Sequence, residues 1–109
     1  MVETSTVIAR NLGREELISE LRALKPAFAR AGVTRMTLFG SRARGDNRPD
    51  SDVDLIIEVD SERKFSLVEL SRVGLVVQDH LGLPASIVMR RSAKPAMLAA
   101  ADRDGVAVF

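Results

Sequence analysis

The chain has 109 residues, the length of one domain, and its 46% hydrophobic and 28% charged residues are typical of a folded globular protein. Sixteen Lys and Arg against 15 Asp and Glu give a formal net charge of +1, so composition argues against a surface that generally attracts nucleic acid or membranes. The absence of Cys excludes disulfides and thiolate chemistry, and four Phe without Trp or Tyr are too few for a base-stacking surface.

The first 13 residues are expected to form an irregular lead-in, followed by one domain over residues 14–109. The lead-in has only a three-residue apolar stretch, Val7–Ala9, so it lacks a signal-peptide core. No apolar run approaches the roughly 20 residues that a membrane helix needs. We therefore expect a cytoplasmic protein with no membrane contact.

A helix is predicted from Arg14, because apolar residues recur at spacings of four and three. These residues are Leu17, Leu21, Leu24 and Phe28. Pro26 either interrupts this helix or begins a second short one, and Gly32 ends it.

Two strands with a short connection are expected next. Met36–Phe39 predicts a strand, and Ser41–Arg44 predicts one helical turn closed by Gly45. Residues 46–51 have the turn chemistry of a loop, and Asp52–Val59 predicts the second strand.

A capping box, Ser66-x-x-Glu69, predicts the start of a helix that runs to about Leu81 and ends at Gly82. A helical wheel of this segment has two apolar faces. One consists of Leu67, Leu70, Val73, Val77 and Leu81, and the other of Val68, Leu75 and Val76 beside Arg72 and Asp79.

The C-terminal part predicts a strand at Ala85–Met89, a helix from Pro95 to near Gly105 and a short strand at Val106–Phe109. The resulting order α-β-β-α-β-α-β predicts an α/β (α+β) domain with a small mixed sheet and flanking helices.

The motif that carries chemistry is Gly40-Ser41, ten residues, then Asp52-x-Asp54. Alternate residues of a strand share a face about 6.6 Å apart, so the two carboxylates repel each other unless a cation lies between them. Mg²⁺ typically takes one or two carboxylates together with phosphate oxygens. Asp52 and Asp54 are therefore the candidate metal ligands and catalytic residues.

The Gly-Ser pair is suited to the phosphates. Gly40 allows a phosphate to approach the backbone, and Ser41 opens a helical turn whose free N–H groups attract anions. Arg42 is the first candidate to reach an outer phosphate and Arg44 the second, while Ser51 is placed for hydrogen bonding near the turn. The two halves meet only if the two strands are antiparallel.

Each part also has an ordinary structural interpretation. Asp-x-Asp at a strand start is often solvated turn chemistry, and Gly-Ser after a strand is usually a plain turn. Arg44-Gly45 has the pattern of a helix end with Gly in the left-handed conformation. The joint spacing, with a strand before each part, favours the functional interpretation.

These residues resemble the polymerase-beta-type nucleotidyltransferase superfamily, in particular its minimal members, the MNT-domain proteins. The resemblance extends from about Arg14 to Phe109. It implies a nucleotidyltransferase fold, ATP as the nucleotide donor and Mg²⁺ as cofactor, with Gly40 and Ser41 holding the triphosphate and Asp52 and Asp54 binding the metal. It also implies a HEPN-domain toxin as partner, on which the MNT protein acts as antitoxin by transferring AMP.

The chain departs from this family at one position. Active members typically carry a third carboxylate on the next strand, where Ala85-Ser86-Ile87-Val88 places Ser86. Serine is a poor metal ligand and no base near neutral pH. Glu58 lies about 13 Å from Asp54 along the strand, too far to substitute. Asp79 has no evident route to the site, and His80 is expected to have a surface or capping role.

Three functions follow as hypotheses. The first is transfer of AMP from ATP to a hydroxyl of a protein partner. The second is a nucleotide-binding module that neutralises its partner by contact, suggested by Ser86 and by the second apolar face. The third, modification of a small molecule, is less favoured because no second domain is available to form an acceptor pocket.

Overall fold

The computed structural model describes residues 12–109. The expected lead-in falls mainly on residues 1–11, which lie outside the described part, so the domain boundary after residue 13 stays a prediction. The elements follow in this order: α2 Arg14–Arg22, α3 Lys25–Ala31, β1 Val33–Phe39, α4 Ser41–Arg44, β2 Val53–Val59, α5 Leu67–Leu81, β3 Ala85–Met89, the 3-10 turn η1 Arg90–Ser92, α6 Pro95–Asp104 and β4 Val106–Ala107.

The helix breaks at Pro26, as one of the two alternatives predicted. Pro26 lies in the first turn of α3, where its missing N–H removes no intrahelical hydrogen bond. Gly32 ends α3 in the left-handed conformation, with φ 102°. The end of α3 therefore lies where the local sequence indicates, whereas the end of α2 at Arg22, before Leu24, was not predicted.

The described strands form one mixed sheet in the order β3-β2-β1-β4. β1 is antiparallel to both β2 and β4, whereas β2 and β3 are parallel. This confirms the mixed sheet and the antiparallel pairing of the first two strands. The parallel pair is connected by α5, as a crossover requires.

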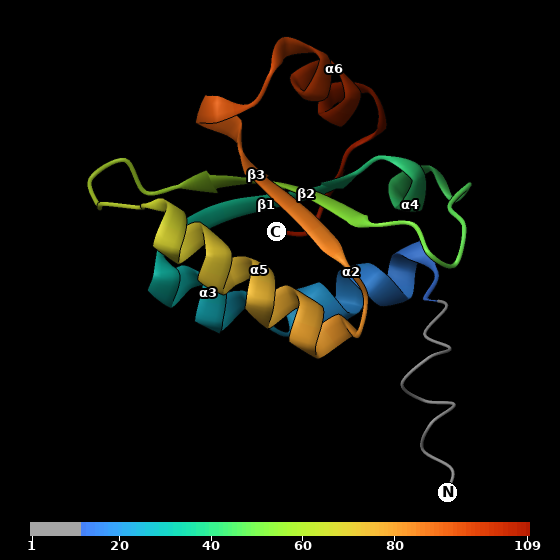
Figure 1. Cartoon of the computed structure of the whole chain (residues 1–109), viewed down its shortest axis with the longest axis horizontal. Helices are drawn as coiled ribbons and strands as arrows, with labels where there is room; N and C mark the ends of the chain where they lie inside the picture. The colour runs from blue at the N-terminus through green and yellow to red at the C-terminus, as the bar shows by residue number, and fades with distance from the viewer. Residues whose placement is uncertain (1–11) are drawn as a thin grey trace, which may run out of the picture.

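Helices cover both faces of the sheet (Figure 1). On one face α2, α3 and α5 enclose the main core, to which β2 contributes Val53, Leu55 and Ile57. On the other face α6 covers a smaller cluster of Phe39, Ile56 and Ala101. Alternate residues of β2 thus point into different layers, and Asp54 shares the α6 face with Ile56.

Helix α5 begins at the predicted capping box. Ser66 Oγ accepts a hydrogen bond from Val68 N, and Glu69 Oε1 accepts one from Ser66 N. The Ser66 hydroxyl also donates to Glu69 Oε1, and this bond, together with the one from Ser66 N, lowers the pKa of Glu69. The prediction that Leu67 belongs to the buried face is wrong: it is 74% exposed, because it is the first residue of the helix and lies at the edge of the buried stripe.

Three further strand boundaries and one turn differ from the sequence prediction. β2 starts at Val53 rather than Asp52. β1 starts at Val33 rather than Met36, with a register irregularity between Val33 and Arg35. β4 ends at Ala107, two residues early, and the turn η1 was not predicted. Within residues 12–109, no helix has the length and apolar character needed to cross a bilayer.

Candidate functional site

The Gly-Ser turn and the aspartate pair lie on neighbouring strands. In the antiparallel register Phe39, the last residue of β1, pairs with Asp54, the second residue of β2. Gly40 and Ser41 follow directly after Phe39, and Asp52 directly precedes β2. The register therefore brings together two motif halves that are separated by ten residues in the sequence.

The backbone of Gly40 lies against the carboxylate of Asp54. A methyl group on residue 40 would lie 2.5 Å from Asp54 Oδ2, closer than atoms can approach. Gly40 also has φ 77° and ψ −157°, a combination that is essentially restricted to glycine. The contact between the turn and the carboxylate thus depends on a residue without a side chain.

Ser41 is the first residue of α4. Its backbone N–H and that of Arg42 belong to the first turn, where amides have no intrahelical acceptor. The amides of Ala43 and Arg44 both donate to Gly40 O, each at 3.1 Å, which fixes the turn. From α2, Arg14 Nη1 donates to Ala43 O at 2.9 Å and anchors the same turn to the body of the domain.

The sequence proposed that Arg42 reaches an outer phosphate, but the structure gives this side chain another position. Arg42 is only 2% exposed, and its guanidinium donates to Ser51 O at 3.0 Å and Pro49 O at 3.2 Å. Ser51 Oγ accepts from Arg48 N at 2.9 Å within the same loop. Arg42 and Ser51 therefore brace the connection between α4 and β2, and the Arg42 guanidinium is enclosed by this loop.

The second arginine candidate, Arg44, is exposed, and its positive charge acts on Asp54. Its side chain is 43% exposed and forms ion pairs with Asp46 at 3.0 Å and Asp104 at 3.2 Å. Gly45, with φ 85°, closes the turn behind it in the left-handed conformation, as predicted. Arg44 is thus held at the surface by one acid from the loop and one from α6.

The charges at the site leave an excess of negative potential. Burial raises the pKa of Asp54 above its ordinary value, the charge of Asp52 raises it further, and the charge of Arg44 partly opposes both. Asp52 is exposed, and Asp54 is half-buried. A cation between the two carboxylates would relieve this repulsion.

The residues present fit a hard divalent cation only as part of a larger ligand set. Among residues 12–109, no group of three or more His, Cys, Asp and Glu side chains could hold a metal by itself. Two carboxylates leave most positions of an octahedral Mg²⁺ to water and phosphate oxygens, which is how this ion usually binds with a nucleotide.

Ser86 lies directly beside this pair. The parallel register of β2 and β3 pairs Asp54 with Ser86, which is exposed. Glu58 forms an ion pair with Arg90 at 3.6 Å near the other end of β2. His80 Nε2 lies 3.1 Å from Glu20 Oε1 on α2, away from the motif, and Asp79 is exposed on α5.

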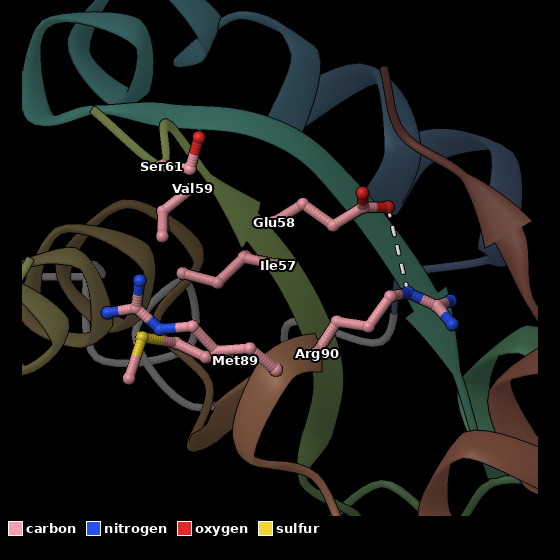
Figure 2. A pocket seen from close by; sticks show the side chains of 7 residues that line it. Ile57, Glu58, Val59, Ser61, Met89 and Arg90 are labelled. Atoms are coloured by element: carbon pink, nitrogen blue, oxygen red, sulfur yellow. Dashed lines mark ion pairs between the residues drawn. The ribbon is translucent and has the colours of Figure 1, made fainter. Parts of the chain in front are cut away.

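A surface pocket of about 270 Å³ lies at the far end of β2 from the aspartate pair. It is lined by Ile57, Glu58, Val59, Ser61, Met89, Arg90 and Arg91 (Figure 2). The sequence analysis did not identify it, because its residues come from the ends of two strands and the segments that follow them.

Fold and site together define a minimal nucleotidyltransferase. The chain belongs to the nucleotidyltransferase domain family, whose sequence profile matches residues 14–104. It is 38% identical over 81 residues to the protein adenylyltransferase MntA of Thermococcus cleftensis, covering 73% of this chain and 80% of that protein.

Solved structures agree with this assignment. A structure described as a minimal nucleotidyltransferase has a TM-score of 0.74 and 30% identity, covering 88% of this chain and 96% of the other. A structure described as the tri-AMPylated HEPN toxin of Shewanella oneidensis in complex with its MNT antitoxin has a TM-score of 0.58 and 17% identity, covering 92% and 71% of the two chains. At this low identity, the second comparison shows the fold alone.

Gly40→Ala is expected to destabilise the fold by about 1–3 kcal/mol from backbone strain, with an additional cost from the clash with Asp54. Gly45→Ala is the matched control, because Gly45 also has positive φ but a methyl group there would meet nothing within 4 Å. Its expected cost is about 1–2 kcal/mol. Urea unfolding of both variants measures the difference, and equal losses would contradict a close contact between Gly40 and Asp54.

Asp54→Asn is expected to raise the melting temperature at pH 7. The folded state raises the pKa of Asp54, so its charged form opposes folding above the ordinary Asp pKa, and this cost disappears as acid protonates the group in both states. The advantage of the variant should therefore vanish below about pH 4. Melting temperatures measured as a function of pH test this prediction. The control is Asp50→Asn, which changes an exposed residue of the loop. A higher melting temperature of Asp54→Asn that persists at low pH would exclude the electrostatic cause.

Proposed function

We propose that this protein transfers AMP from ATP to a hydroxyl of a protein partner, and that the partner is a HEPN-domain toxin for which it acts as antitoxin. The observation that carries the proposal is the pairing of Phe39 with Asp54, which joins an anion-attracting turn to a carboxylate pair. The names of the similar proteins support the acceptor and the partner. A reaction that uses ATP agrees with the cytoplasmic location expected from the sequence.

In this proposal the turn at Gly40 and Ser41 binds the triphosphate, and Asp52 and Asp54 hold Mg²⁺. When bound, Mg²⁺ neutralises charge that develops on the phosphates. Arg44, rather than Arg42, is the arginine available to an outer phosphate, because Arg42 is enclosed by the loop that it braces. Asp46 and Asp104 orient Arg44 through its two ion pairs.

The transfer itself is an in-line displacement. The acceptor oxygen forms a bond to the α-phosphorus, the bond from the α-phosphorus to the bridging oxygen breaks, and its electron pair leaves with pyrophosphate. The hydroxyl proton passes to solvent, because Ser86 occupies the position next to Asp54 and cannot accept it near neutral pH. General-base assistance is typically worth about 10²–10⁴-fold, so we propose a slow transfer.

Label transfer tests this proposal. The protein is incubated with ATP labelled at the α-phosphate, Mg²⁺ and a HEPN-domain protein encoded next to it, and label on the partner is measured. We expect transfer by the wild type, none by Asp52→Ala, and wild-type transfer by Asp50→Ala, which removes an exposed carboxylate two residues away. No transfer by the wild type, or equal transfer by Asp52→Ala, would contradict the proposal.

A second candidate function is neutralisation of the partner by contact alone. Two observations favour it: Ser86 stands in the place of a carboxylate, and four large apolar side chains are exposed on α5. These are Leu67, Val68, Leu75 and Val76. In this case the protein binds nucleotide but needs no transfer to block its partner.

Ser86→Asp separates the two candidates. A carboxylate beside Asp54 is expected to accelerate transfer by up to about 10²–10⁴-fold, whereas the neutral control Ser86→Asn should not. Initial rates of label transfer measure this effect. If the wild type blocks its partner without ATP and only Ser86→Asp transfers label, contact is the native function. Loss of partner binding in Leu75→Glu would then identify α5 as the contact surface.

A further inference from the structure

The outer edge of β3 carries backbone groups that are free to pair with another strand. β3 is the last strand of the sheet beside β2 (Figure 1). Val53 N donates to Pro84 O at 2.8 Å, so in this parallel ladder Ser86 and Val88 direct their N–H and C=O groups toward β2. Ile87 and Met89 therefore direct theirs outward.

Within the described residues little protects this edge. The outward amide of Ala85 donates a hydrogen bond to Gln78 Oε1, with N···O 3.4 Å. Among the described residues, no side chain accepts a hydrogen bond from the amides of Ile87 and Met89. Edge strands are normally protected by a charge, a proline or a bulge. The strand Ala85–Met89 contains neither a charge nor a proline.

The edge is continuous with the candidate site. Across the sheet, the turn after β1 comes first, then the aspartate pair on β2, then Ser86 on β3, with about 4.8 Å between neighbouring strands. If the turn binds the triphosphate, pyrophosphate leaves on the β1 side of Asp54. An in-line acceptor then enters from the opposite side, next to Ser86.

The pocket of Figure 2 lies at the C-terminal end of β3, where the last residues of β2 extend beyond their pairing with β3. Met89 lines it, three residues or about 10 Å beyond Ser86. Val59 also contributes a partly exposed apolar side chain. Arg90 is already paired with Glu58 and Asp102, so the positive charge that the pocket offers is that of Arg91, whose guanidinium also donates to Phe65 O at 3.1 Å. The pocket thus suits an apolar side chain that is accompanied by an acidic group.

We propose that an extended segment of the protein partner pairs with the outer edge of β3 as a fifth strand of the sheet. One end of this segment places the acceptor hydroxyl next to Ser86, on the β3 side of Asp54. The other end places an apolar residue and a neighbouring acidic residue at the pocket beside Arg91. This inference rests on the proposed function and names the form in which the acceptor is recognised.

Amide hydrogen exchange followed by NMR tests the edge directly. In the free protein the amides of Ile87 and Met89 should exchange at least about tenfold faster than those of Ser86 and Val88. Addition of the HEPN-domain partner without ATP should slow Ile87 and Met89 to the rates of their neighbours. Protection confined to α5, with the β3 edge unchanged, would overturn the proposal.

Proline substitution provides the second test. Ile87→Pro removes an outward N–H and leaves the ladder to β2 intact, while Ile87→Ala removes a comparable amount of packing and keeps the N–H. Calorimetric titration should give at least about tenfold weaker partner binding for Ile87→Pro than for Ile87→Ala. Equal affinities would overturn the proposal, as would concentration-dependent protection of Ile87 in the free protein, which indicates pairing between two copies.

Charge reversal at the pocket provides a third test of the proposal, which remains available if Ile87→Pro does not fold. Arg91→Glu should weaken partner binding, whereas Arg30→Glu, at an exposed position of α3, should not; equal effects would overturn the proposal. Because these readouts measure binding without ATP, they are separate from label transfer. Protection of the β3 edge without AMP transfer would reject the proposed reaction and leave the docking mode supported.

Discussion

The antiparallel register of β1 and β2 is the constraint on which the rest of the site depends. It is fixed by the core, because Val53, Leu55 and Ile57 all point into the main hydrophobic layer. A slip of one residue would turn these side chains to the other face and Asp54 into the core. The hydrophobic pattern of β2 therefore determines which way Asp54 points and which turn it meets.

Electrostatics gives this arrangement its chemical character. Two acidic side chains and a closely approaching backbone turn gather at one end of the two central strands, and the compensating charge of Arg44 is shared with Asp46 and Asp104. The folded protein therefore carries repulsion that a bound cation would remove. Asp104 also links the end of α6 to the turn, so the C-terminal helix supports the site from the second layer.

The successive strands have different tasks in this interpretation. The turn after β1 is suited to phosphates, β2 carries the carboxylates, and β3 presents the hydroxyl of Ser86 beside Asp54, where the resemblance implies a further carboxylate in active relatives. In the proposed reaction a serine there gives less catalytic assistance than a carboxylate, and it leaves the edge of β3 uncharged. An uncharged edge is a better template for an added strand, so a slow reaction and tight recognition of a partner are compatible here.

Local chemistry made much of the fold predictable. The capping box at Ser66, the helix stops at Gly32 and Gly82, and Pro26 act within one turn of the chain, and all lie where the sequence indicated. The requirement that the Gly-Ser and Asp-x-Asp motifs share one site also predicted that the two strands are antiparallel, which the register confirms.

Tertiary packing decided what local patterns leave open. Arg42 and Arg44 are two residues apart on one helical turn, and only the path of the loop at Pro49 and Ser51 encloses the first while ion pairs hold the second at the surface. Leu67 fits the apolar stripe of α5 but begins the helix at the edge of that stripe and stays exposed. Sequence determined the elements and the motif because these depend on neighbours along the chain, whereas the orientation of each side chain depends on contacts between distant segments.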